Sequence, residues 1–128
     1  LAAAKNDKLD SLIARGQQHS INFTGHSIAT DGAYGPKTQA NVARCFQVAI
    51  NKDYGAKLKV DGAFGKNSKS ALGKHYVKRK ETQCLVTAVE IALMCSGLEA
   101  AVKQFQSDRG LKVDGIAGRN TILKLMGV

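Results

Sequence analysis

The chain has 128 residues and a formal net charge of +9, because Lys and Arg outnumber Asp and Glu by 19 to 10. Hydrophobic residues make up 44% of it, with one proline and no tryptophan. This composition excludes a disordered chain and fits one ordinary domain or two small ones. The charge favours an anionic partner, such as nucleic acid, an anionic membrane or an anionic cell-wall polymer, although a basic surface also serves solubility alone.

The ends and apolar runs of the chain bear on its cellular setting. No apolar run reaches the ~18 residues that a membrane-spanning helix needs, so we predict no membrane span. The chain starts at Leu1 rather than Met, and its first residues lack the pattern of a signal peptide. We therefore expect a fragment or a processed chain.

Apolar residues recur at helical spacing along most of the chain, which predicts an all-α fold. Helices are predicted from about Leu9 to Thr24, Thr38 to Asp53, Ala71 to His75, Thr82 to Gly97, Glu99 to Arg109, and Ile122 to Leu125. The helix that starts at Thr82 is apolar around much of its circumference, so we predict that it is the central buried helix. The basic stretch from Lys74 to Lys80 is predicted to be a linker.

One short phrase, Asp-Gly-x-x-Gly, occurs three times, at Asp31–Gly35, Asp61–Gly65 and Asp114–Gly118. A hydroxyl residue follows each copy, namely Thr38, Ser68 or Thr121. Asp-Gly favours a tight turn, because Asp can bond its own downstream backbone and Gly accepts positive φ. Each phrase therefore predicts a turn that leads into a helix, with the hydroxyl close to the unpaired N–H groups of the helix start. We expect the three aspartates to build turns rather than to catalyse.

Two stretches of the chain match in order, which predicts an internal duplication. The stretch from Val42 to Gly62 corresponds to the stretch from Val102 to Gly115. We predict a first three-helix unit over residues 1–77 and a second over residues 78–128. An Asp-Gly phrase is missing between Leu98 and Glu99, where the second unit should have one, so we expect that a loop there was deleted or is disordered.

Residues 101–121 carry the order Phe-Gln, Gly-Leu-x-Val-Asp-Gly and Gly-x-x-Thr. This order resembles the peptidoglycan-binding type 1 module, a three-helix unit carried by cell-wall hydrolases and phage endolysins. The first unit resembles it more loosely, with Ser68 in place of Thr and a longer insertion ahead of Leu58. The resemblance implies two tandem three-helix units joined by short Asp-Gly turns. That arrangement is similar to the C-terminal wall-binding part of lysins from clostridial phages or their hosts.

The resemblance implies a non-catalytic module that binds peptidoglycan or an anionic wall polymer and targets a lytic enzyme to the bacterial wall. The catalytic domain of a parent hydrolase would then be a further partner. Two alternatives stay open: a structural or pro-region module that packs on a catalytic domain, or a nucleic-acid-binding domain that uses Lys78 to Lys80. No helix-turn-helix or zinc-finger pattern supports the last, so nucleic acid is the less favoured partner.

Catalytic, metal and cofactor sites are not predicted. The three histidines, His19, His26 and His75, lie in different segments without the spacing of a metal site. The three cysteines, Cys45, Cys84 and Cys95, form no Cys-x-x-Cys pair. We expect them to be buried free thiols that pack as small hydrophobic groups.

Candidate ligand-binding residues lie at the turn tips and the adjoining helix starts. Such positions can combine an aromatic platform with amide and basic donors, which suits acetamido, hydroxyl and carboxylate groups. The candidates are Tyr34, Lys37, Phe64, Lys66, Asn67, Arg119 and Asn120. The alternative for Tyr34 and Phe64 is that each ring fills the core.

Overall fold

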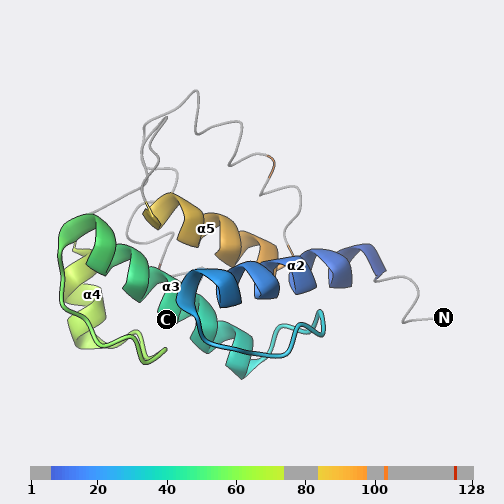
Figure 1. Ribbon diagram of the computed structural model, residues 1–128, viewed down its shortest axis with the longest axis horizontal. Coiled ribbons are helices and arrows are strands. Elements are labelled where there is room, and N and C mark those ends of the chain that lie inside the picture. Colours follow the sequence, from blue (N-terminus) through green and yellow to red (C-terminus); the bar gives the residue numbers. More distant parts are fainter. Residues whose placement is uncertain (1–6, 74–83, 98–102, 104–122, 124–128) are drawn as a thin grey trace.

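The computed structural model describes residues 7–73 and 84–97, together with positions 103 and 123. The chain runs through four helices in the described ranges, and no strand occurs in them (Figure 1). The helices are α2 (Asp7–Thr24), α3 (Pro36–Tyr54), α4 (Lys66–Leu72) and α5 (Cys84–Cys95). The all-α prediction is thus confirmed for this part. The predicted linker and His75, the gap between Leu98 and Glu99, and all of the two last predicted helices except positions 103 and 123 lie outside the described residues.

The ends of α3 follow from its sequence. Gly35 is the N-cap residue with extended backbone, and Pro36 takes the first helical position, where its missing N–H costs nothing. Gly55 ends the helix at φ 69° and donates its N–H to the carbonyl oxygen of Asn51. Helix α4 also has a glycine with extended backbone, Gly65, as its N-cap residue. Among the described residues, no helix has the length and apolar character that crossing a membrane requires.

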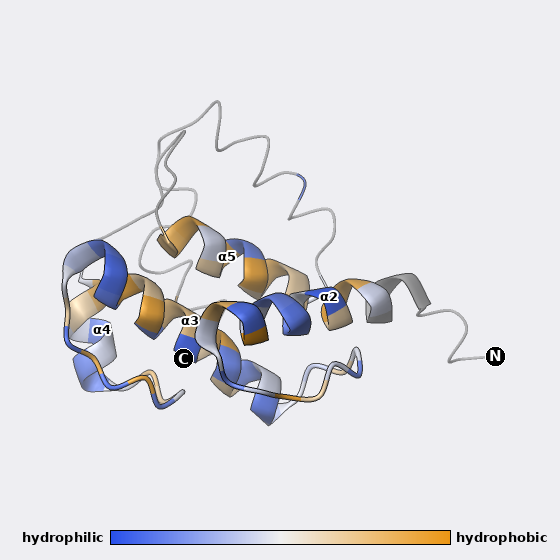
Figure 2. Ribbon diagram, in the orientation of Figure 1, coloured by the Kyte–Doolittle hydropathy of each residue, from blue (hydrophilic) through white to orange (hydrophobic). Residues whose placement is uncertain are grey.

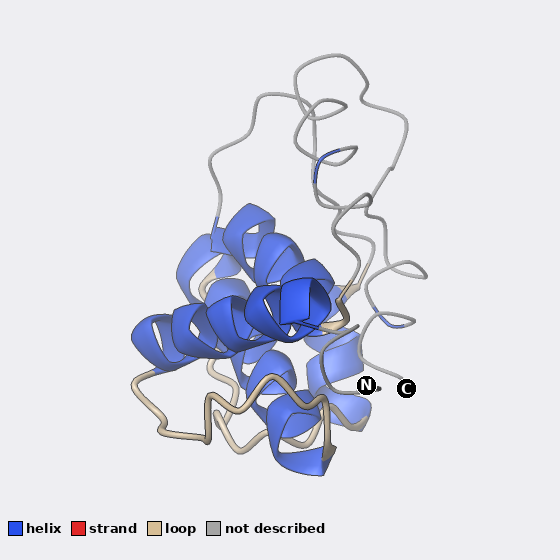
Figure 3. Ribbon diagram, turned by 90° about the vertical axis from the view of Figure 1, so that its right-hand side faces the viewer, coloured by secondary structure: helices blue, strands red, loops and turns tan. Residues whose placement is uncertain are grey.

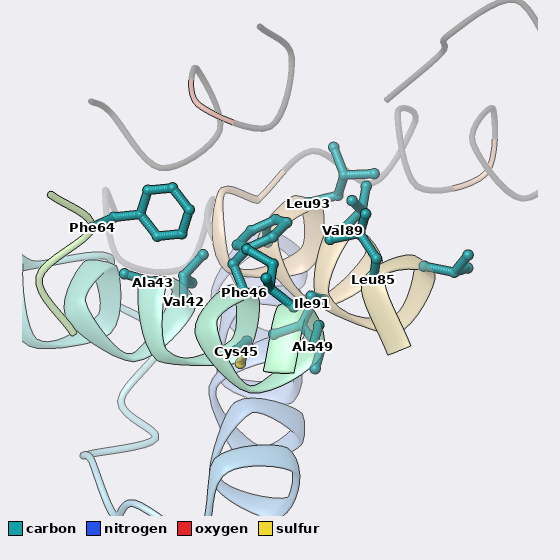
Figure 4. Close-up of a cluster of buried hydrophobic side chains, with 14 of the residues drawn as sticks. Val42, Ala43, Cys45, Phe46, Ala49, Phe64, Leu85, Val89, Ile91 and Leu93 are labelled. Atoms are coloured by element: carbon teal, nitrogen blue, oxygen red, sulfur yellow. The ribbon is translucent and has the colours of Figure 1, made fainter. Parts of the chain in front are cut away.

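Helix α5 packs against both α2 and α3, and α2 also packs against α3. Figure 2 shows that α5 is mostly hydrophobic, with a short hydrophilic stretch near its middle. Its buried residues are Leu85, Val86, Ala88, Val89, Ile91, Ala92, Leu93 and Cys95. Burial on most sides of the helix confirms the prediction that this segment is the central buried helix. It packs with α3 residues that include Val42, Cys45, Phe46, Ala49 and Ile50 (Figure 4).

The close contact of α2 with α5 depends on Gly16. A Cβ atom at this position would lie 2.7 Å from the backbone nitrogen of Cys95 and 2.8 Å from Cβ of Met94. Any side chain there would force the two helices apart. Gly16 thus sets the distance at which α2 crosses the apolar helix.

Asp53, in the last turn of α3, caps the start of α5. Its Oδ1 accepts the N–H of Cys84 at 3.0 Å, and its Oδ2 accepts the N–H of Leu85 at 2.8 Å. The first N–H groups of a helix have no partner within the helix, so this carboxylate satisfies two of them. The end of α3 therefore fixes where α5 begins.

The cysteines are free, as predicted. Cys45 and Cys95 are fully buried, and burial raises the pKa of each thiol to about 12. Cys84, at the start of α5, is only half-buried; burial and then the neighbouring Asp53 carboxylate raise its pKa. All three thiols are therefore protonated at neutral pH.

Helix α5 belongs to the second of the two predicted units but shares one core with α3 and packs against α2. The described residues thus pack together across the boundary predicted at position 77. The division into units 1–77 and 78–128 stays a prediction, because most of the second unit lies outside the described residues.

Candidate functional site

Two loops that contain the repeated phrase join α2 to α3 and α3 to α4. Both lie on the side of the helices that faces away from α5 (Figures 1 and 3). Asp31 and Asp61 are 30 residues apart, and the same spacing relates Gly35 to Gly65. Helix α3 therefore ends one repeat and begins the next. We call Asp31–Gly35 the first turn and Asp61–Gly65 the second turn.

The first turn is clamped by Gln17 of α2, a side chain with no solvent exposure. Its Nε2 donates to Asp31 Oδ1 at 3.2 Å, to the carbonyl oxygen of Ala33 at 3.0 Å and to Thr38 Oγ1 at 2.9 Å. Its Oε1 accepts the N–H of Gly32 at 3.0 Å. One amide group thus ties the first turn to α2 and to Thr38 at the start of α3.

The second turn has the same clamp, formed by Gln47 of α3. Its Nε2 donates to Asp61 Oδ1, to the carbonyl oxygen of Ala63 and to Ser68 Oγ, each at 3.1 Å. Its Oε1 accepts the N–H of Gly62 at 3.0 Å. The two turns are therefore held by the same hydrogen bonds at equivalent atoms.

Each aspartate builds its turn, as predicted for Asp31 and Asp61. Oδ1 of Asp31 accepts the N–H of Ala33 at 3.0 Å, and Oδ1 of Asp61 accepts the N–H of Ala63 at 2.9 Å. These backbone bonds, and then the bonds from the clamping glutamines, lower the pKa of both carboxyl groups. Both are ionised at neutral pH. The third aspartate, Asp114, lies outside the described residues.

The hydroxyl groups that follow the turns lie near the helix starts, as predicted, but they do not cap these helices. Thr38 and Ser68 each occupy the third position of a helix, yet neither N-cap has a side-chain hydrogen bond. Both hydroxyl oxygens instead accept from the clamping glutamine. Each hydroxyl therefore binds a side chain of the preceding helix instead of the N–H groups of its own helix.

The glutamines were missed by the sequence analysis, although the chain contains a signal for them. Gln17 and Gln47 both lie eight residues before a glycine with positive φ that follows a helix, Gly25 or Gly55. The same position relative to Gly97, after α5, is occupied by Val89, and no Asp-Gly pair follows Gly97 at the spacing found after Gly25 and Gly55. In the part of the chain that the structure describes, the glutamine and the turn that it clamps occur together.

A second polar network strengthens only the first repeat. Asn41 of α3 is fully buried and donates to Ser20 Oγ at 2.8 Å and to the carbonyl oxygen of His26 at 3.4 Å. The residues 30 positions further on are Ile50 and Ala71, which are apolar. The first repeat thus joins its helices by hydrogen bonds where the second packs hydrocarbon.

The loop of the second repeat has its own anchor. Asn51 donates to the carbonyl oxygen of Leu58 at 3.0 Å and accepts the N–H of Leu58 at 2.8 Å. This pair holds the approach to the second turn. The position equivalent to Asn51 in the first repeat is Ile21, which cannot make such bonds.

A groove lies beside each turn. The first groove has a volume of about 380 Å³, and its lining includes Ile28, Ala29, Tyr34, Pro36 and Lys37. The second groove has a volume of about 360 Å³, and its lining includes Lys59, Asp61, Lys66, Asn67 and Ser68. The two grooves occupy equivalent places on the repeated turns but differ in chemistry.

The predicted site residues of the first turn line the first groove. The Tyr34 side chain is 39% exposed and Lys37 is also exposed. Partial burial of its ring, and then Cys95, raises the pKa of Tyr34. Its hydroxyl is therefore a neutral hydrogen-bond donor at neutral pH. The structure brings these two predicted residues together.

The other predicted residues divide into three groups. Lys66 and Asn67 are exposed and line the second groove. Phe64 is only 6% exposed, and its ring lies over Val42 and Ala43 in the core (Figure 4), which is the alternative left open for it. Arg119 and Asn120 lie outside the described residues.

Comparison with known proteins bears on the last part of the chain. Residues 94–125, a quarter of the sequence, match the sequence model of a family described as "putative peptidoglycan binding domain". The match begins at Met94 in α5 and contains the third Asp-Gly phrase. No curated protein and no solved structure shows significant similarity to the chain. The chain thus has one segment similar to a peptidoglycan-binding domain.

Within the described part, no group of three or more His, Cys, Asp or Glu side chains is placed to hold a metal ion.

Proposed function

We propose that this chain is a non-catalytic module that binds peptidoglycan and targets a lytic enzyme to the bacterial cell wall. Residues 94–125 support it through their similarity to a peptidoglycan-binding domain. The Asp-Gly phrase in that segment recurs at both clamped turns, which supports a further unit of the same kind in residues 7–73. We propose that the parent protein is a cell-wall hydrolase, of endolysin type, with this chain as its tandem wall-binding part over units 1–77 and 78–128.

The proposed binding site is based on the exposure of Tyr34 to solvent. The equivalent ring in the second repeat, Phe64, is buried in the core, although both turns have the same hydrogen-bond clamp. Packing of this turn therefore does not require an exposed aromatic ring. An aromatic ring beside a groove offers an apolar face to a sugar ring and a hydroxyl to its polar groups.

The remaining proposed contacts surround this ring. Lys37 lies in the first groove and supplies a positive charge beside Tyr34. Lys66 and Asn67 supply a positive charge and an amide at the second turn. Arg119 and Asn120 are the proposed equivalents at the third phrase. Phe64 acts by holding the second turn on the core and not by direct contact with the wall.

Co-sedimentation with purified sacculi tests the function. The full chain is mixed with peptidoglycan sacculi and, in parallel, with double-stranded DNA at the same salt concentration. We expect retention on sacculi that persists when salt is raised, and weak retention on DNA that salt abolishes. Retention on DNA with none on sacculi would overturn the proposal and favour the nucleic-acid alternative.

A further inference from the structure

The two grooves form a natural comparison, because their backbone frames are the same and their linings differ. The glutamine clamps hold equivalent atoms in both turns. Lys59 and Lys66 in the second groove take the places of Ala29 and Pro36 in the first. Differences in binding between the grooves must therefore come from the side chains that line them.

The first groove combines an apolar wall with balanced charge. Tyr34, Ile28 and Pro36 provide apolar surface, and Lys37 offsets the charge of Asp31. Such a lining suits the uncharged face of an N-acetylated amino sugar, where C–H groups meet the ring and the acetamido group meets polar atoms.

The second groove has a more polar lining and carries a net positive charge. Its lining includes the ammonium groups of Lys59 and Lys66 and the carboxylate of Asp61. Among the residues that the structure describes, no aromatic ring lines it, because Phe64 is directed into the core. The two lysines, and not the short helix α4, supply its positive charge.

We propose that the two grooves bind different parts of the wall polymer: the first an uncharged amino-sugar face, and the second a single carboxylate of the stem peptide. The inference rests on the proposed function. The sum of two positive charges and one negative charge in the second groove matches a ligand of one negative charge.

Backbone amide chemical shifts of the full chain test this division. The probes are chitotetraose, the free stem tetrapeptide, and the same tetrapeptide with every carboxylate amidated, each at millimolar concentration. We expect chitotetraose to shift the signals of residues 31–37 and the free tetrapeptide to shift those of residues 59–67. Amidation should abolish the second effect. Shifts from both probes in one groove, shifts that survive amidation, or no shift in either groove would overturn the division.

Matched variants sharpen the test. Lys59→Ala/Lys66→Ala should weaken tetrapeptide binding about three- to tenfold, as expected for the loss of two exposed ion pairs, and leave chitotetraose binding unchanged. The control is Arg15→Ala/Lys57→Ala, which removes the same charge at exposed positions outside both grooves. An equal loss in both double variants would mean that only net charge matters, which contradicts the proposal. Retention on sacculi, measured in parallel, reports on the proposed function separately.

Discussion

The two repeats share one clamp but surround it with different side chains. In both, a buried glutamine fixes an Asp-Gly turn through equivalent hydrogen bonds. In the first repeat Asn41 and Ser20 add a buried polar link and Tyr34 faces solvent; in the second the link is apolar and Phe64 faces the core. The turn is therefore a fixed frame, and the residues that it presents are free to differ. Function should follow the presented residues.

The largest expected effect comes from removing a clamp. Gln17→Leu should lower the free energy of unfolding by about 2–3 kcal/mol, because the N–H of Gly32, a buried residue, loses its acceptor. Gln47→Leu should cost somewhat less, since Gly62 is partly exposed and water can replace the amide. Urea unfolding of both variants measures the difference.

The control for the clamp is Gln18→Leu, at an exposed amide on the same helix. It should change the free energy of unfolding by less than about 0.5 kcal/mol. Equal small effects at Gln17 and Gln18 would show that the turn holds itself and that the clamp is not the shared frame.

The next largest effect on the free energy of unfolding is expected in the first repeat only. Asn41→Ala should destabilise the chain by about 1–2 kcal/mol, because Ser20 Oγ and the carbonyl oxygen of His26 lose a buried donor. The second repeat already has Ala71 at the matching position, so Ala71→Ser should have little effect. Thermal or urea unfolding compares the two, and an equal cost at both positions would contradict a polar link confined to the first repeat.

Asp53 offers a third test, because its equivalent in α2 is Phe23, which cannot cap a helix. Asp53→Ala should cost about 1 kcal/mol through loss of the cap on α5. Asp53→Asn, which keeps one acceptor oxygen, should cost about half as much. A stability unchanged by Asp53→Ala in urea unfolding would show that α5 starts without help from α3.

The smallest effect is a dependence on pH. Asp31 and Asp61 have pKa values below the ordinary 3.8, so the unfolded chain binds protons first as the pH falls. Their contribution to stability is full above about pH 5 and is lost as the pH drops through the lowered folded pKa. Asp31→Asn and Asp61→Asn should each flatten the fall in the free energy of unfolding between about pH 5 and pH 2. If the free energy of unfolding of these variants fell with pH as steeply as that of the original chain, the assignment of the pH dependence to Asp31 and Asp61 would be contradicted.

Much of this fold could be predicted from the sequence, because its signals are local. Pro36 and Gly55 mark the ends of α3, and the largely apolar sequence of α5 identifies the buried helix. The Asp-Gly pairs identify the turns through chemistry that spans three residues. Such features depend on neighbours in the chain and not on the rest of the fold.

The clamp and the orientation of the rings could not be predicted in this way. Gln17 reaches partners 14 to 21 residues away, and a lone glutamine in a helix resembles an ordinary surface residue. Tyr34 and Phe64 occupy the same place in the phrase, yet one is exposed and the other buried. That choice depends on whether the facing helix leaves room for a ring, which only the packed structure shows.

The exposed ring of Tyr34 gives the most direct test of wall binding. Val60 has the same exposed fraction, 39%, but lies outside the first groove, which makes Val60→Ala a matched control for Tyr34→Ala. In co-sedimentation with sacculi we expect Tyr34→Ala to weaken binding about tenfold, equivalent to about 1.4 kcal/mol, and Val60→Ala to bind as the original chain does. Both variants should keep the original melting temperature. Unchanged binding of a folded Tyr34→Ala variant would contradict the assignment of the first groove to the wall polymer.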